Sequence, residues 1–216
     1  MNKVLIVAAH PDDELLGVGG IVLKHKNEGD EVRAIIFCEG ESLRYKKDVG
    51  QKDAIVEASE VLGIDKTYHL KFPDQKLDQY CLTDIITPIE KISEEYKPNL
   101  IYCQCGFDAN RDHKILFEAA NIAFRPTHFW VKELYCFYTT SSTEWGYPRQ
   151  FIPDTWVDIS KFLAKKIEAF EKYHSEVREY PHPRSSASLE YQAHFWGNQC
   201  CLDAAEVLMT IRKIVK

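Results

Sequence analysis

Two polar clusters in the chain each follow a run of apolar residues. The first, HPDDE at residues 10–14, comes directly after the apolar stretch VLIVAA, and the second, DANRDH at residues 108–113, comes shortly after LIYCQC. Imidazole and carboxylate groups bind divalent metals and transfer protons in hydrolytic enzymes. The two clusters therefore predict a site for metal-assisted or acid–base chemistry.

Three of these side chains have the types and spacing of a catalytic zinc site. His10 and Asp13 lie three residues apart on a turn and can point to the same side, and His113 can supply a third ligand. Two histidines and one carboxylate leave a position open for water, as in catalytic rather than structural zinc sites. Bound water becomes a usable nucleophile near neutral pH. We expect the adjacent Asp12 to be the general base that takes its proton.

Helix capping is an alternative interpretation of the same residues. Aspartate is a favoured N-cap, and acidic side chains suit the first turn of a helix. Capping accounts for one aspartate but not for the whole segment HPDDE, so the sequence favours a functional site there. For Asp112 and His113 both interpretations remain open, and Glu14 by itself is better explained by the helix dipole.

The elements that would position these clusters alternate between strands and helices. We expect strands at 3–9, 31–38, 67–72, 99–105 and 133–139, and helices at 15–28, 48–62, 82–96, 113–124, 159–174 and from about 189. This order predicts an α/β, Rossmann-like fold with one mainly parallel sheet and helices on both faces. Pro-rich, aromatic loops and the last helices would form a C-terminal cover. Ligands bind at the carboxyl ends of parallel strands, where both clusters fall.

Length and composition limit the classes of protein that the chain can be. The 216 residues, 45% of them hydrophobic, predict a single domain over residues 1–216. The net charge of -6, with interspersed acids and bases, argues against a nucleic-acid partner. The N-terminus has the pattern of neither a signal peptide nor a transmembrane segment, so we expect a cytoplasmic protein. Most of the seven cysteines lie in apolar strand patterns, which predicts buried free thiols.

The motifs carry a resemblance to a known family. AHPDDE after the first strand, together with DANRDH after the fourth, is similar to the LmbE-like or PIG-L family of zinc-dependent N-acetylglucosaminyl deacetylases. The order of strands and helices, the segment FPDQKLD and the pair Arg125 and Pro126 follow the same pattern, so the resemblance covers residues 4 to about 126. It implies a hydrolase with one zinc ion per chain that removes the acetyl group from an N-acetylated amino sugar.

The resemblance also implies roles for individual residues. Carried over by position, His10, Asp13 and His113 would bind the zinc ion. Asp12 would be the general base. Asp112 would not bind the metal itself but would orient a neighbouring group of the site.

Asn110 departs from the family pattern, because many members have a histidine at this position. An asparagine N–H can stabilise the negative charge that develops on the amide oxygen of the substrate. It cannot donate a proton to the departing amine. We expect Asp12 to return the proton that it has accepted, and His182, in a Pro-rich loop, is the alternative acid.

We assign Arg44, Asp108 and His182 to the substrate side of the site. Arg44 belongs to a small basic group after the second strand, where a phosphate contact would suit a nucleotide-linked or lipid-linked sugar; a solvated surface charge is the alternative. The partner would be a small N-acetylated sugar or sugar conjugate, and an oligomer is possible. The segment GVGG at residues 17–20 does not match a dinucleotide-binding loop and predicts close helix packing instead.

Two other functions remain open from the sequence alone. The metal site would equally serve an amidohydrolase that acts on another N-acylated small molecule, such as a natural-product or thiol precursor. A nucleotide-binding module without catalysis would need only the sheet. Measurement of bound metal distinguishes the nucleotide-binding module, which needs none, from the deacetylase and the amidohydrolase, which both need it.

Overall fold

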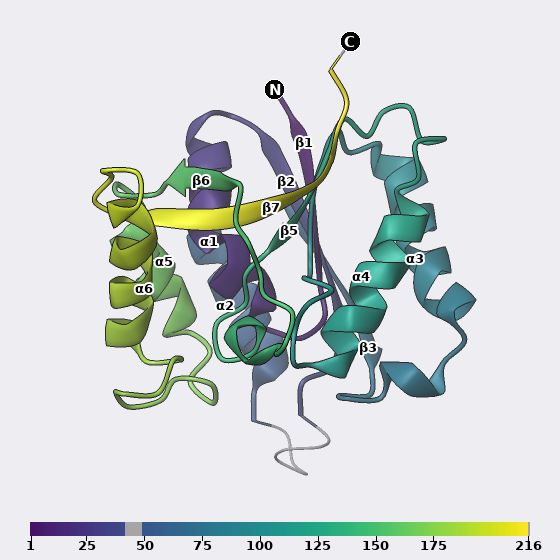
Figure 1. The fold of residues 1–216 in the computed structure, drawn as a ribbon. Helices are drawn as coiled ribbons and strands as arrows, with labels where there is room; N and C mark the ends of the chain where they lie inside the picture. Colours follow the sequence, from purple (N-terminus) through teal and green to yellow (C-terminus); the bar gives the residue numbers. More distant parts are fainter. Residues whose placement is uncertain (42–48, 216) are drawn as a thin grey trace.

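Seven strands form the central sheet of the computed structural model, which describes residues 1–41 and 49–215 (Figure 1). The strand order is β3-β2-β1-β4-β5-β7-β6. The pairs from β3 to β5 are parallel, and β7 runs antiparallel to both β5 and β6. The strands are β1 (Lys3–Ala8), β2 (Glu31–Cys38), β3 (Lys66–Phe72), β4 (Leu100–Cys103), β5 (Glu133–Phe137), β6 (Thr155–Asp158) and β7 (Ala205–Lys213).

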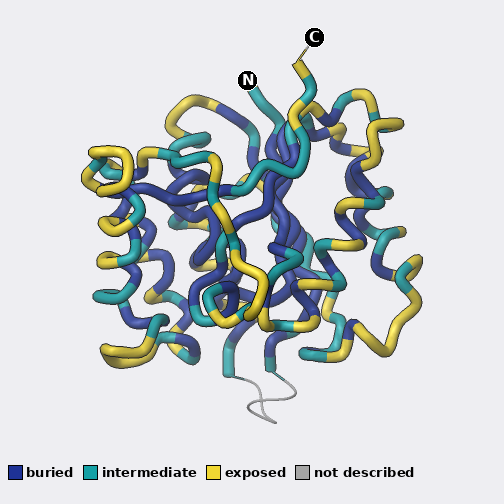
Figure 2. Tube along the Cα trace, in the orientation of Figure 1, coloured by how far each residue is buried: buried dark blue, intermediate teal, exposed yellow. Residues whose placement is uncertain are grey.

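Six described α-helices cover the two faces of the sheet. Helices α1, α2, α5 and α6 contribute to one hydrophobic cluster, and α3 and α4 contribute to a second cluster on the opposite face. Figure 2 shows the resulting dark, buried centre of the molecule. The helices are α1 (Asp13–Asn27), α2 (Gln51–Leu62), α3 (Leu82–Tyr96), α4 (Arg111–Ala123), α5 (Leu163–Phe170) and α6 (Ser186–Asn198). The predicted α/β fold with helices on both faces is confirmed.

The C-terminal segment differs from the sequence prediction. The expected strands end at residue 139, but β6 and β7 extend the sheet by two antiparallel strands. Phe137 of β5 pairs with Leu208 of β7, a contact between distant residues that local periodicity does not reveal. The helix expected over 159–174 is confined to α5, and the expected start of α2 at residue 48 lies outside the described residues.

Other sequence expectations agree with the structure. Cys38, Cys103, Cys105 and Cys136 are buried free thiols. Among the helices of the described chain, none has the length and apolar character that a membrane crossing requires.

The glycines of GVGG allow α1 to pack closely against the sheet and the C-terminal cover. A Cβ atom on Gly17 would lie 2.2 Å from the ring of Phe137, and one on Gly20 would lie 2.7 Å from Ile159. Between these glycines, Val18 has non-helical backbone angles, and the helix kinks. The expected packing role of the segment is confirmed.

A buried ion pair satisfies the backbone groups around this kink. Glu206 on β7 accepts the N–H groups of Gly20 and Ile21 at 2.9 and 2.7 Å. Lys166 on α5 donates to the carbonyl oxygen of Leu16 at 2.9 Å and lies 2.7 Å from Glu206. Because a kink removes helical hydrogen bonds, charged partners at this point stabilise a backbone that would otherwise hold unpaired groups.

We predict that Glu206→Gln destabilises the fold by about 3–5 kcal/mol, because it leaves the Lys166 ammonium buried without a counter-ion. Chemical denaturation measures the free energy of unfolding. The matched control is Glu28→Gln, whose partner Lys24 is exposed, and it should cost less than about 1 kcal/mol. An equally small effect for both variants would contradict the role given to Glu206.

Candidate active site

The two polar clusters meet at the carboxyl ends of β1 and β4, which are neighbouring parallel strands. Val7 pairs with Cys103, so the loops that leave these strands start side by side. Asp13 begins α1, and His113 lies in the first turn of α4. His10 and His113 both line one cleft. The parallel sheet thus brings together residues that lie about one hundred positions apart in the sequence.

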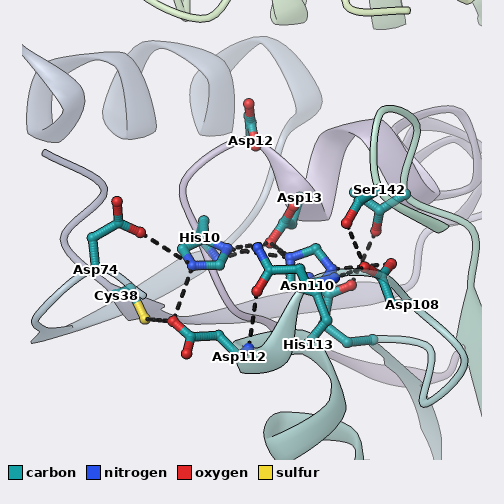
Figure 3. Close-up of polar contacts among 12 residues, drawn as sticks. His10, Asp12, Asp13, Cys38, Asp74, Asp108, Asn110, Asp112, His113 and Ser142 are labelled. Carbon is teal, nitrogen blue, oxygen red and sulfur yellow. Dashed lines mark hydrogen bonds and ion pairs between the residues drawn. The ribbon is translucent and has the colours of Figure 1, made fainter. Parts of the chain in front are cut away.

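His10, Asp13 and His113 bring three ligand atoms together (Figure 3). His10 Nδ1 lies 3.3 Å from Asp13 Oδ2 and 3.2 Å from His113 Nε2. Asp13 Oδ2 and His113 Nε2 are 3.1 Å apart. Metal–ligand bonds of about 2.0–2.1 Å in a tetrahedral site place neighbouring ligand atoms about 3.3 Å apart. The three residues therefore have the spacing that a tetrahedral zinc ion requires.

Carboxylates lie on the far side of both imidazoles and orient them. Asp108 Oδ2 is 3.1 Å from His113 Nδ1. Asp112 Oδ2 and Asp74 Oδ1 are each 3.2 Å from His10 Nε2. Metal-binding histidines commonly donate their second N–H to a carboxylate, which fixes the nitrogen that faces the metal. Asp74 was not among the expected site residues, although its segment FPDQKLD follows β3 at the same edge of the sheet.

Asp13 is held in place by the backbone and by a glutamine. The N–H of His10 and the side-chain amide of Gln104 donate to Asp13 Oδ2 at 2.8 and 2.6 Å. Asp13 Oδ1 is buried and has no hydrogen-bond partner within the described residues. An orphaned carboxylate oxygen beside two imidazoles fits a site that binds a cation. Gln104 was not expected here; a polar residue inside the apolar run LIYCQC was the available signal.

The electrostatics of this pocket favour positive charge. Burial lowers the pKa of His113, but the carboxylates of Asp13 and Asp108 outweigh this effect and raise the pKa to about 9. Burial also lowers the pKa of His10, and Asp112 and Asp13 again raise it well above its usual value. A pocket that stabilises protons on both imidazoles also attracts a divalent cation, which competes with those protons.

Asp12 lies beside these residues but contacts an arginine from the C-terminal cover. Its backbone φ of 93° is in the left-handed region, where aspartate is tolerated better than most residues. Arg184 Nη1 donates to Asp12 Oδ2 at 2.7 Å and to Glu176 Oε2 at 2.8 Å. Asp12 Oδ1 is buried and has no hydrogen-bond partner in the described part of the chain. Burial raises the pKa of Asp12 well above its usual value, and Arg184 opposes part of this shift.

Asn110 and Asp112 combine capping with a place at the site. Asn110 is the N-cap of α4, where its Oδ1 accepts the N–H of Asp112 at 2.9 Å. Asn110 also lines the cleft beside His113. The two interpretations that the sequence left open for this segment are therefore compatible, because capping uses backbone N–H groups and leaves the imidazole of His113 to the site.

Asp108 does not have the position expected of a substrate contact. Its side chain is fully buried, and it accepts the N–H of Asn110 and the hydroxyl groups of Ser142 and Thr143. It also faces His113 Nδ1. A carboxylate enclosed in this way orients an imidazole and is not accessible to a substrate. Asp108 therefore orients His113 and is not the substrate contact that the sequence predicted.

His182 and Glu14 are not among the described residues that line the cleft of His10 and His113. His182 lines a neighbouring cleft with Trp145 and Arg178, and Arg44 lies outside the described residues. Glu14 is buried away from the cleft, where the hydroxyl of Tyr173 donates to it at 2.7 Å. Burial raises the pKa of Glu14 to about 7.

Known proteins share both the sequence pattern and the fold of this chain. It is 24% identical to the uncharacterized deacetylase YaiS of Escherichia coli (strain K12), over 80% of this chain and 90% of the relative. It is also 24% identical to the diacetylchitobiose deacetylase of Thermococcus kodakarensis, over 83% of this chain and 72% of the relative. The crystal structure of the conserved protein TT1542 from Thermus thermophilus has a TM-score of 0.83 and 24% identity, and the match covers 100% of this chain and 97% of that protein.

The family model described as PIG-L, GlcNAc-PI de-N-acetylase, matches residues 5–124, which is more than half of the chain. The match contains both HPDDE and DANRDH, and so it includes His10, Asp13 and His113. With this match the family predicted from the two motifs is confirmed, and the chain belongs to the PIG-L family of deacetylases.

Proposed function

We propose that residues 1–216 act as one zinc-dependent N-deacetylase domain that removes the acetyl group from an N-acetylated amino sugar or sugar conjugate. The observation that carries the proposal is the triangle of His10 Nδ1, Asp13 Oδ2 and His113 Nε2, with a carboxylate behind each imidazole. Family membership supports the reaction class. The name of the Thermococcus kodakarensis relative, a diacetylchitobiose deacetylase, supports a sugar substrate.

The lining of the cleft supports a hydroxylated substrate. Among the described residues that line the cleft, all but Pro11 and Gly40 carry a polar side chain. Polar groups that converge on one cleft fix the orientation of a ligand by hydrogen bonds, whereas an apolar ligand would leave them unpaired. A sugar ring offers the donors and acceptors that such a lining requires.

When bound, the zinc ion would lower the pKa of a water molecule from about 16 to about 7 and polarise the amide carbonyl. His10, Asp13 and His113 would hold it. Asp108 and Asp112 orient the two imidazoles, each within 3.2 Å of the second ring nitrogen. This leaves one position of a tetrahedral site for water, as catalytic zinc requires.

Asp12 is the group best placed to move protons. Arg184 fixes its Oδ2, so Oδ1 is the oxygen that accepts the proton of the attacking water. Burial raises the pKa of Asp12, which makes its carboxylate a better proton acceptor. The proton that Asp12 has accepted then passes to the departing amine, so that the amine leaves in neutral form.

Asn110 and His182 take different parts in this scheme. The Oδ1 of Asn110 accepts a backbone N–H, so its amide nitrogen is the end that can donate to the carbonyl oxygen of the substrate. His182 lines the neighbouring cleft, and its Nδ1 accepts the N–H of Arg184 at 3.0 Å. We therefore keep Asp12 as the general acid and give His182 a place near the substrate.

The His113→Ala variant tests the metal ligands. We expect wild-type protein to hold about one zinc ion per chain and the variant to lose it, while circular dichroism shows an intact fold. The control is His194→Ala, which replaces a half-exposed histidine on α6 and should keep its zinc. Elemental analysis after gel filtration measures the metal, and full occupancy in His113→Ala would disprove the ligand assignment.

The Asp12→Asn variant tests the base. Asparagine keeps the shape of the side chain and its contact with Arg184 but cannot accept a proton, so we expect turnover to fall by roughly 10²-fold or more with the metal retained. The control is Asp53→Asn on the exposed face of α2. Near-normal turnover, or loss of metal from Asp12→Asn, would count against this role.

The substrate class is tested by product release. We expect purified protein with zinc to release acetate from N-acetylglucosamine or diacetylchitobiose and to expose one free amine for each acetate. N-hexanoyl analogues of the same sugars are the matched comparison. Turnover of the longer acyl chains with no acetate release from any acetylated sugar would favour an amidohydrolase for a different small molecule.

A further inference from the structure

A second group of potential metal ligands lies on the other side of His10. One ligand atom each of His10, Cys38 and Asp112 lies within 4.8 Å of the other two, and all three residues are buried. Asp112 Oδ2 is 3.2 Å from His10 Nε2 and 3.5 Å from Cys38 Sγ (Figure 3). Because the two nitrogens of one imidazole point in opposite directions, this group is separate from the triangle at His10 Nδ1.

Several polar atoms surround His10 Nε2, among them the side-chain nitrogen of Gln75 at 3.1 Å. His10 Nε2 carries at most one proton, yet two carboxylate oxygens, from Asp74 and Asp112, lie 3.2 Å from it. The thiol of Cys38 points to the same oxygen of Asp112. A ring nitrogen, a sulfur and a carboxylate oxygen that meet in a buried place are the ligand types that zinc takes in proteins.

The ligand atoms are held in place by the backbone. The N–H of Leu77 donates to Asp112 Oδ1 at 3.1 Å and leaves Oδ2 directed at the group. The N–H of Cys38 donates to the carbonyl oxygen of Ala9 at 2.7 Å, which fixes the end of β2 against β1. Zinc–sulfur bonds of about 2.3 Å and zinc–oxygen bonds of about 2.0 Å place the two ligand atoms about 3.5 Å apart in a tetrahedral site. Cys38 and Asp112 already have this separation.

We propose that His10 Nε2, Cys38 Sγ and Asp112 Oδ2 form a second cation site, which takes Zn²⁺ or Cd²⁺ when the ion is in excess. Its filling releases two protons to the solvent, one from the Cys38 thiol and one from His10 Nε2, and the imidazole then bridges two cations. A thiolate ligand selects borderline and soft ions such as zinc and cadmium over magnesium or calcium. The site itself does not depend on the reaction that the protein catalyses.

The consequence for activity rests on the proposed function. The second cation takes Asp112 away from its orienting contact with His10. It also places a second dipositive ion on the other side of the same imidazole, and repulsion between the two ions opposes binding of the first. Excess zinc should therefore inhibit deacetylation when it binds at the site of His10, Cys38 and Asp112.

Cadmium titration tests the site directly, because a cadmium thiolate has an ultraviolet charge-transfer band that oxygen and nitrogen ligands lack. The exposed Cys81, Cys200 and Cys201 are first replaced by serine to give a parent protein. We expect this parent to bind two cadmium ions per chain, with the band appearing during the second equivalent. Cys38→Ser and Cys38→Ala in the same background should each bind one ion and show no band.

The matched control is Cys103→Ser. Cys103 is a buried thiol that donates to the carbonyl oxygen of Tyr135, and its replacement should leave the binding of two cadmium ions and the ultraviolet band unchanged. A parent that binds a single ion without the band, or a band that persists in both Cys38 variants, would overturn the proposal. If one of the two Cys38 variants folds poorly, the other still tests the site.

An activity measurement separates this site from the proposed function. Zinc beyond one equivalent should lower acetate release by the parent at least tenfold and leave Cys38→Ser near its basal rate. If cadmium fills the second site but no acetate is released by any form, the proposed function fails and the site stands. If acetate is released but excess zinc inhibits the parent and Cys38→Ser equally, the inhibitory role of the site is refuted.

Discussion

The parallel register between β1 and β4 is the constraint on which the rest of the site depends. Val7 pairs with Cys103, so HPDDE and DANRDH leave the sheet at adjacent points. A shift of this register by one residue would reverse the faces of a whole strand and separate the two clusters. The apolar residues of both strands are buried on both faces of the sheet, and this burial fixes the register.

A high density of carboxylates follows from this convergence. Asp13, Asp108 and Asp112 are all buried near the two imidazoles. Buried charges are stable only when partners of opposite charge or hydrogen-bond donors surround them. The serine, threonine and glutamine side chains around Asp108 and Asp13 supply donors, and the proposed cation would supply the balancing charge. Metal affinity and the stability of this edge of the fold would then be linked.

The sequence predicts the parallel half of the fold and the centre of the site because their signals are local. The strand that precedes HPDDE and the apolar run before DANRDH are visible in short windows of residues. The antiparallel β7 and the contact of Arg184 with Asp12 depend on residues far apart in the chain, and the latter pair is 172 positions apart. Local patterns carry no information on such pairs.

Asp108 illustrates a different limit of sequence reasoning. Its motif places it at the edge of the sheet, but only its enclosure by Ser142 and Thr143 shows that it faces His113 and not the cleft. Asn110 shows the opposite case, because its capping bond to Asp112 follows from the residue type and its position before a helix. Side chains with local roles are thus more predictable than side chains whose role depends on tertiary contacts.

In the proposed enzyme, the first zinc ion binds at His10 Nδ1, Asp13 and His113 and not at the group that contains Cys38. Zinc X-ray absorption spectroscopy of protein loaded with one equivalent tests this assignment most directly. We predict only nitrogen and oxygen neighbours, at about 2.0–2.1 Å, with the multiple-scattering pattern of two imidazoles. A sulfur neighbour at about 2.3 Å in the one-equivalent sample would contradict the account, because it would place the first ion at Cys38.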